Sequence, residues 1–169
     1  MSQTRLEGLL VKLEKGHQKT REYFSNLTPE EWQLPVYGAP EWSAHNLLAH
    51  FVSAEEHLLE LSQNVAGDGS GAPEGIDINR FNAQEQVRLQ GKTTPELLDA
   101  LDQARQRTII WARTLTDEQL DNKGRHPALG EIRVETMLTA IYGHQILHMR
   151  DLTRLKRVQA VEARHDKPN

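Results

Sequence analysis

The chain of 169 residues is 37% hydrophobic and 26% charged, with a formal net charge of −4, a composition typical of a soluble globular protein. This mildly acidic balance gives no general attraction for nucleic acid, and no apolar run approaches the roughly 18 residues of a membrane span. The absence of cysteine excludes disulfides, thiolate metal ligands and a cysteine nucleophile. We therefore expect a single domain over residues 1–169, located in the cytoplasm, without nucleic-acid or membrane partners.

The first half of the sequence predicts two long helices joined by a short helical turn and a loop. Apolar residues over 6–27 repeat at helical spacing. Residues 28–31 (Thr-Pro-Glu-Glu) place a capping threonine before a proline and a glutamate, which indicates a short turn of helix. Residues 35–42 contain two prolines and a glycine and are predicted to form a loop. Ser43 is a suitable N-cap for a second helix that extends to about residue 65.

A long crossover is predicted between the second and third long helices. Residues 66–75 are rich in glycine and are expected to form a flexible connection. Residues 77–89 are predicted to form either a shorter helix or an irregular crossover. The third long helix is predicted to begin at Thr94-Pro95-Glu96, with the threonine as its cap and the proline at its first position, and to continue to Leu115.

The second half of the sequence repeats the plan of the first. The pieces 27–30 and 115–118 look alike, each with a capping threonine before a short helical turn, and this likeness indicates an internal repeat. After a loop, a fourth long helix is predicted over 133–156, and a polar tail from about residue 157 is expected to fray. These elements predict an all-α four-helix bundle with one long crossover between its second and third helices.

Three histidines are predicted to point into the bundle. His144 and His148 lie four residues apart on the predicted fourth helix, so both side chains leave the same face. On the second helix, His50 follows Leu47 by three residues and therefore points inward too. Neutral imidazoles bind zinc, nickel or iron, and three protein ligands leave a position open for water or substrate. The alternative is that these histidines are ordinary core residues with satisfied hydrogen bonds.

Two other residues near this set are candidates for roles in chemistry. His57, two helical turns after His50, is interpreted as a pocket residue, an alternative ligand or a partly buried polar contact. Asp151, three residues after His148, is either a hydrogen-bond partner of a ligand imidazole or part of an ion pair with Arg150 or Arg154. The aromatic residues are expected to pack in the core or an interface rather than to line a pocket: Trp32, Tyr37, Trp42, Trp111 and Tyr142.

Several short stretches of the sequence resemble one known family. Residues 42–50 (Trp-Ser-Ala-His-Asn-Leu-Leu-Ala-His) combine a Trp-Ser helix start with Leu-x-His, and 144–148 form a His-x-x-x-His pair. The pair continues into 148–152 (His-Met-Arg-Asp-Leu), and 79–82 (Asn-Arg-Phe-Asn) contain a Phe-Asn element. Together they resemble the DinB-like superfamily of four-helix bundles, which includes YfiT-type metal-dependent hydrolases and mycothiol-dependent maleylpyruvate isomerase.

The resemblance covers nearly the whole chain and implies a metal centre. It implies that His50, His144 and His148 are the ligands of a divalent metal ion, usually zinc or nickel. It also implies a homodimer. Asn82, in the Phe-Asn element, becomes a candidate cofactor-binding residue.

The first functional hypothesis is a metal-dependent enzyme that acts on a small-molecule substrate through a low-molecular-weight thiol such as mycothiol or bacillithiol. Coordination to a metal favours the thiolate, which adds to an electrophile in S-transfer or isomerisation and serves detoxification or stress response. The substrate thiol would supply the sulfur that the chain itself lacks.

Two alternatives to this hypothesis stay open at the level of sequence. One is a YfiT-type hydrolase, which needs a general base, and Glu55, Glu56, His57 and Asp151 are the candidates. The motif is not that of a metalloprotease, because Gln145 rather than a glutamate follows His144. The other alternative is a non-catalytic stress-response or binding bundle whose metal ion only stabilises the fold.

Overall fold

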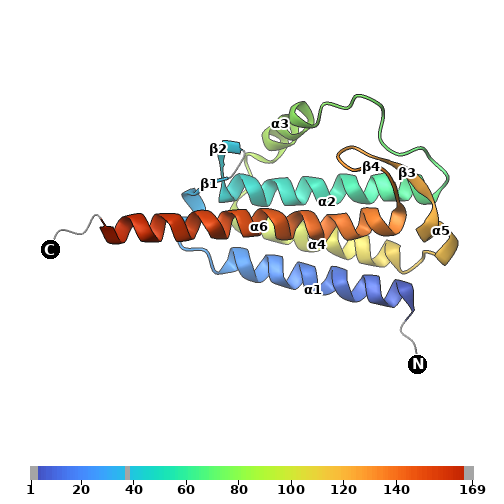
Figure 1. Cartoon of the computed structure of the whole chain (residues 1–169), viewed down its shortest axis with the longest axis horizontal. Helices are drawn as coiled ribbons and strands as arrows, with labels where there is room; N and C mark the ends of the chain where they lie inside the picture. Colours follow the sequence, from blue (N-terminus) through green and yellow to red (C-terminus); the bar gives the residue numbers. More distant parts are fainter. Residues whose placement is uncertain (1–3, 37–38, 166–169) are drawn as a thin grey trace.

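Four long helices lie side by side in the computed structural model, which describes residues 4–36 and 39–165 of the chain (Figure 1). They are α1 (Arg5–Ser25), α2 (Ala44–Ala66), α4 (Thr94–Ala112) and α6 (Val134–His165). Their contacts place them around the bundle in the order α1, α6, α2, α4, so that α1 and α2 lie diagonally opposite. In Figure 1, α1 and α6 run in one direction and α2 and α4 in the other. The predicted all-α four-helix bundle is confirmed, and no helix within these ranges is long and apolar enough to cross a membrane.

Capping boxes define where three of the long helices begin. Thr4 caps α1, and Ser43 caps α2 as predicted. The cap of α4 is Thr93 rather than Thr94, because the carboxylate of Glu96 accepts a hydrogen bond of 2.7 Å from the backbone N–H of Thr93. The two partners of a capping box lie three positions apart, and that spacing from Glu96 selects Thr93. Pro95 therefore occupies the second position of the helix.

The connections within each half are hairpins as well as turns. In the first half, the 3-10 turn η1 (Glu31–Gln33) is followed by β1 (Pro35–Val36) and β2 (Ala39–Ser43), which pair antiparallel. The prediction of a loop over 35–42 was therefore wrong. Strands of two to five residues are too short to show a pattern of alternating hydrophobicity.

The second half contains the same order of elements. α5 (Asp117–Asp121), capped by Thr116, is followed by the antiparallel strands β3 (Lys123–His126) and β4 (Gly130–Arg133), where a loop was predicted. Both halves thus read long helix, short turn, hairpin, long helix, and the repeat indicated by the sequence is confirmed in the order of elements. The crossover between the halves carries α3 (Ile78–Leu89), which packs against α2.

Aliphatic residues from all four long helices form the core, and α1 and α6 approach closely. A Cβ atom added to Gly16 of α1 would lie 2.8 Å from the Cβ of Tyr142 on α6, so a larger residue does not fit there. The aromatic residues pack against the core as predicted: Trp32, Trp42, Trp111 and Tyr142. Tyr37 lies outside the described residues. α6 continues to His165, beyond its predicted end at Lys156, and the rest of the predicted tail, 166–169, is likewise outside them.

Candidate metal centre

Three imidazoles from two neighbouring helices meet inside the bundle. His50 projects from α2, and His144 and His148 project from α6 one turn apart. The Nε2 atom of His144 lies 3.0 Å from Nε2 of His50 and 3.0 Å from Nε2 of His148. One nitrogen from each ring lies within 4.8 Å of the others. The inward orientation predicted from helical spacing brings these three residues together.

Burial keeps these three rings in their neutral form. The pKa of His50 is lowered to about 4 by desolvation and by repulsion from His148. The pKa of His144 is lowered well below its ordinary value by desolvation, and then by repulsion from His50 and His148. Desolvation also lowers the pKa of His148, against an opposing effect of Asp151. Neutral imidazole is the form that binds a divalent metal ion.

The spacing of the nitrogens suits a single ion. A zinc ion binds imidazole nitrogens at about 2.0–2.1 Å in tetrahedral geometry, which places two such nitrogens roughly 3.3 Å apart. The two 3.0 Å separations are close to that value. The rings of Trp42 and Phe51 surround the set, with centroids 5.4 Å from His50 and 5.8 Å from His144 respectively. The donor set and its apolar surroundings therefore fit a divalent metal ion.

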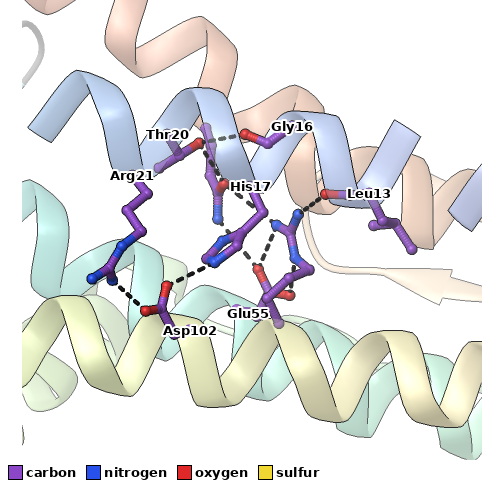
Figure 2. Close-up of polar contacts among 9 residues, drawn as sticks. Leu13, Gly16, His17, Thr20, Arg21, Glu55 and Asp102 are labelled. Atoms are coloured by element: carbon purple, nitrogen blue, oxygen red, sulfur yellow. Dashed lines mark hydrogen bonds and ion pairs between the residues drawn. The ribbon is translucent and has the colours of Figure 1, made fainter. Parts of the chain in front are cut away.

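A buried ion pair lies one helical turn further along α2 (Figure 2). Both carboxylate oxygens of Glu55 accept hydrogen bonds from Arg105 of α4, at 2.6 Å and 2.7 Å. The side chains are 0% and 1% exposed, so water does not screen this pair. Arg105 also donates to the backbone carbonyl of Leu13 on α1, at 2.6 Å. The pair thus joins three of the four long helices.

The fourth long helix joins this network through the residue next to His144. Gln145 of α6 accepts a hydrogen bond from the hydroxyl of Thr20 at 3.0 Å and donates to Glu55 at 3.3 Å. The hydroxyl of Thr108 donates to Glu55 at 3.0 Å. Because Gln145 follows His144 directly, the network fixes the rotation of α6 that presents His144 to His50.

A known family model covers most of the chain. The family model of the DinB superfamily matches residues 12–152. The chain belongs to the DinB superfamily. A protein of Oceanobacillus iheyensis named "Putative metal-dependent hydrolase" is 22% identical over 140 residues, which cover 83% of this chain and 79% of that protein.

Two solved structures of similar fold agree with this membership. YfiT from Bacillus subtilis, described as a probable metal-dependent hydrolase with an unusual four-helix bundle topology, matches with a TM-score of 0.74 at 20% identity, over 95% of this chain and 90% of YfiT. A mutant of the mycothiol-dependent maleylpyruvate isomerase matches with a TM-score of 0.70 at 16% identity. This match covers 90% of our chain but 63% of the isomerase chain. These likenesses confirm the fold.

None of the other predicted site residues of this DinB-superfamily chain belongs to the cluster of three imidazoles. His57 packs edge-on against Phe81 of α3, with ring centroids 4.6 Å apart, and its nitrogens lie 3.3 Å from Glu60 and 3.6 Å from Glu85. Asn82 is half-buried on α3. The charge of Asp151 opposes the lowering of the pKa of His148 by desolvation, and Asp151 lines an open groove between α1 and α6.

Sequence reasoning missed His126, to which it assigned no role. This histidine ends β3, is 8% exposed, and lies near enough to His144 to lower the pKa of that ring by charge repulsion. Its signal in the sequence was weak, because a histidine in a presumed loop has no helical phase to place it. Glu55, a candidate general base, turns out to be held entirely by the buried network.

The free energy of unfolding of the metal-free protein is expected to fall as the pH is lowered from about 7 to 5. In the unfolded chain a histidine titrates near its ordinary pKa of about 6.5, whereas burial holds the pKa of His50 at about 4 and lowers that of His144. Between about pH 7 and 5 these histidines therefore bind protons in the unfolded chain but not in the folded protein. Each such histidine costs up to about 1.4 kcal/mol of stability per pH unit in this window, and the stability is fully present above pH ~6.5.

Urea denaturation in the presence of a chelator, repeated across this pH range, measures the effect. His50→Asn is expected to flatten the pH dependence relative to the unchanged chain. A free energy of unfolding that does not change between pH 7 and 5 would show that the histidines are not buried in their neutral form.

Proposed function

We propose that this member of the DinB superfamily is a metal-dependent enzyme whose single divalent ion, zinc or nickel, is held by His50, His144 and His148. The observation that carries the proposal is the convergence of three neutral imidazole nitrogens, two pairs of them 3.0 Å apart. Three protein ligands leave a coordination position for a small molecule, which is typical of catalytic rather than structural metal sites.

A divalent ion at this centre supplies Lewis acidity, which favours the deprotonated form of a thiol or a water ligand. The side chains around the imidazoles determine the polarity of the site. Trp42 and Phe51 form an apolar wall beside the imidazoles, which lowers the local dielectric and strengthens charge interactions there.

The reaction that we favour uses a small thiol, such as mycothiol or bacillithiol, for S-transfer or isomerisation in detoxification or stress response. We favour this reaction because the glutamates that could act as a general base are already held in ion pairs. Glu55 is held by Arg105, and Glu56 is paired with Arg88 and Arg107. Within the described residues, no unpaired carboxylate is hydrogen-bonded to the three imidazoles. A thiol needs only the metal to become a nucleophile, whereas hydrolysis of an amide also needs a general base.

Hydrolysis is the second candidate, and the names of relatives favour it. The Oceanobacillus protein and YfiT are both described as metal-dependent hydrolases, and the chain spans more of each than of the isomerase. In this alternative Asp151 or His57 would act as the general base. A homodimer and a cytoplasmic location belong to the proposal in either case.

The first test is the metal content of untagged protein purified without chelators, determined by mass spectrometry. About one zinc or nickel ion per chain is expected. The loaded protein is then assayed with a small thiol and an electrophile, by loss of free thiol, and in parallel with a panel of amides and esters. Thiol consumption that stops when the metal is removed supports the favoured reaction, and metal-dependent hydrolysis supports the alternative. Protein without metal, which also fails to take up added zinc or nickel, overturns the proposed function.

A further inference from the structure

An open groove lies on the surface between α1 and α6, which run side by side (Figure 1). Its volume is about 700 Å³, within the range of sites that bind small molecules. The α6 residues that line it extend from Ile146 to Arg157, so the groove is roughly 16 Å long at the rise of an α-helix. This shape suits an elongated ligand better than a compact one.

Apolar side chains form one part of the groove. Ile146, Leu147 and Met149 of α6 line it together with Tyr23 of α1. Leu147 is 59% exposed, which is unusual for a leucine in a bundle. The ring of Tyr23 is held in position, because its phenol oxygen lies 3.1 Å from the hydroxyl of Thr153 on α6. An apolar ligand chain lying here would remove the side chain of Leu147 from water, which favours binding.

The lining becomes basic further along α6. Arg150, Arg154 and Arg157 lie four and three residues apart, so they occupy the same side of the helix. Lys19 of α1 adds a fourth positive charge, and Asp151 is the only acidic residue among those that line the groove. The formal net charge of the chain is −4, so this groove is a local concentration of positive charge on an acidic protein.

These four cations have no counter-ion among the described residues. None of them makes an ion pair with Asp151 or with another described carboxylate. The described arginines that precede α6 are paired with carboxylates, with the exception of Arg80. Lys156, also on α6, is paired with Glu31 at 2.9 Å. An acidic ligand would therefore supply a partner that these four cations lack within the described part of the chain.

We propose that the groove between α1 and α6 binds an elongated organic anion with an apolar chain. Its carboxylate or phosphate lies among the three arginines, and its chain lies along Ile146 and Leu147. A guanidinium donates two parallel hydrogen bonds to either head group. An extended chain of about twelve atoms spans roughly 14 Å, which matches the length of the groove. A second copy of this chain is a poor occupant, because a two-fold contact would bring the two sets of arginines together. The site needs no metal ion and goes beyond the proposed function.

The test titrates dodecyl phosphate, kept below its micelle concentration, into the protein by isothermal titration calorimetry. Octyl phosphate and inorganic phosphate test the contribution of the chain, and dodecyltrimethylammonium tests the sign of the charge. The variant Arg150→Gln/Arg154→Gln removes two positive charges from the groove. Arg80→Gln is the matched control, because Arg80 is an exposed arginine of α3 that makes no ion pair with a described residue and does not line the groove. Each titration is repeated with His144→Ala, which reveals any binding of phosphate to a metal ion.

We expect saturable binding of about one dodecyl phosphate per chain. In Arg150→Gln/Arg154→Gln the affinity should fall at least about tenfold, the size expected for lost hydrogen bonds to a charged group, and in Arg80→Gln it should stay within about twofold. Octyl phosphate should bind at least about tenfold more weakly than dodecyl phosphate, because fewer methylene groups leave water. Inorganic phosphate and dodecyltrimethylammonium should not saturate the protein at the same concentrations. His144→Ala should bind dodecyl phosphate as tightly as the unchanged protein.

Several results would overturn the inference. One is the absence of saturable binding by the unchanged protein, and another is an unchanged affinity in Arg150→Gln/Arg154→Gln. Equal affinity for dodecyltrimethylammonium would indicate adsorption to apolar surface, and loss of binding in His144→Ala would place the phosphate on the metal ion. Binding to vesicles of anionic phospholipid without binding of monomeric dodecyl phosphate would replace the ligand with a membrane surface.

Circular dichroism reports whether each variant keeps its fold. Should Arg150→Gln/Arg154→Gln not fold, Lys19→Gln takes its place, because Lys19 is exposed and lines the groove from the other helix. It should weaken dodecyl phosphate binding by about threefold, a modest loss typical of one exposed charge. An unchanged affinity in Lys19→Gln would then overturn the inference.

Discussion

Replacement of His144 by alanine is expected to weaken zinc or nickel binding by at least a hundredfold while the bundle stays helical. Its Nε2 atom lies 3.0 Å from the nitrogens of both other imidazoles, so it occupies the middle of the set. Loss of a residue that merely supports a ligand already costs about 10–100-fold in metal affinity, and loss of the ligand itself should cost more. Competition with a chromophoric chelator measures the affinity, and circular dichroism measures the helix content.

The same titration on other histidines supplies the controls. His50→Ala and His148→Ala should show comparable losses. His57→Ala removes an imidazole from the same helix as His50, but one that packs against Phe81 instead, and its metal affinity should stay within about threefold. An equal loss for His57→Ala would place His57 among the ligands. Stoichiometric binding retained by all three other variants would contradict the three-histidine assignment.

Replacement of Arg105 by methionine is expected to destabilise the protein by about 3–5 kcal/mol, the cost typical of breaking a buried ion pair on one side. The substitution leaves the carboxylate of Glu55, which is 0% exposed, without its bidentate partner. The hydroxyl of Thr108 and the amide of Gln145 still donate to it, but neither carries a charge. Urea denaturation measures the difference in free energy of unfolding.

The double variant Glu55→Leu/Arg105→Met separates two contributions to stability: the cost of burying the two charges, and the cost of leaving one buried charge without its partner. Replacing both partners with apolar residues removes the buried charge altogether, and such exchanges are often neutral or stabilising. The double variant should therefore recover most of the stability lost in Arg105→Met. A loss below about 1 kcal/mol in Arg105→Met would show that Glu55 finds water or becomes protonated at little cost, and that the network is not a rigid support for α6.

The long helices and the three metal-ligand candidates were within reach of sequence reasoning. A helix of some twenty residues displays several periods of its apolar pattern, so the phase of His50, His144 and His148 follows from neighbours such as Leu47 and Met137. Capping residues marked the helix starts to within one residue, the difference at α4 being that between Thr93 and Thr94. Helical phase and capping depend on residues close together in the chain, so they can be predicted from short stretches of sequence.

The remaining features depend on contacts between distant parts of the chain. The pairing of Glu55 with Arg105 joins residues 50 positions apart, and nothing in either helix alone indicates it. The short strands of both hairpins are held by their neighbours rather than by their own pattern. His126 acquires its environment only because the β3–β4 hairpin packs against α2 and α6. Chemistry that arises from such contacts is not visible in spacing.

The repeated order of elements also makes the bundle nearly symmetric, and the buried network respects that symmetry. Glu55 is the twelfth residue of α2, and Gln145 is the twelfth residue of α6. Each accepts a hydrogen bond from a threonine in the other half of the chain, Glu55 from Thr108 of α4 and Gln145 from Thr20 of α1. The metal-ligand candidates break the symmetry. Counted from the same helix starts, the counterparts of His50, His144 and His148 are Ala140, Ala54 and Leu58. The scaffold is therefore doubled but the donor set is not, because the positions in α6 and α2 that correspond to the three histidines carry aliphatic side chains without metal-binding atoms.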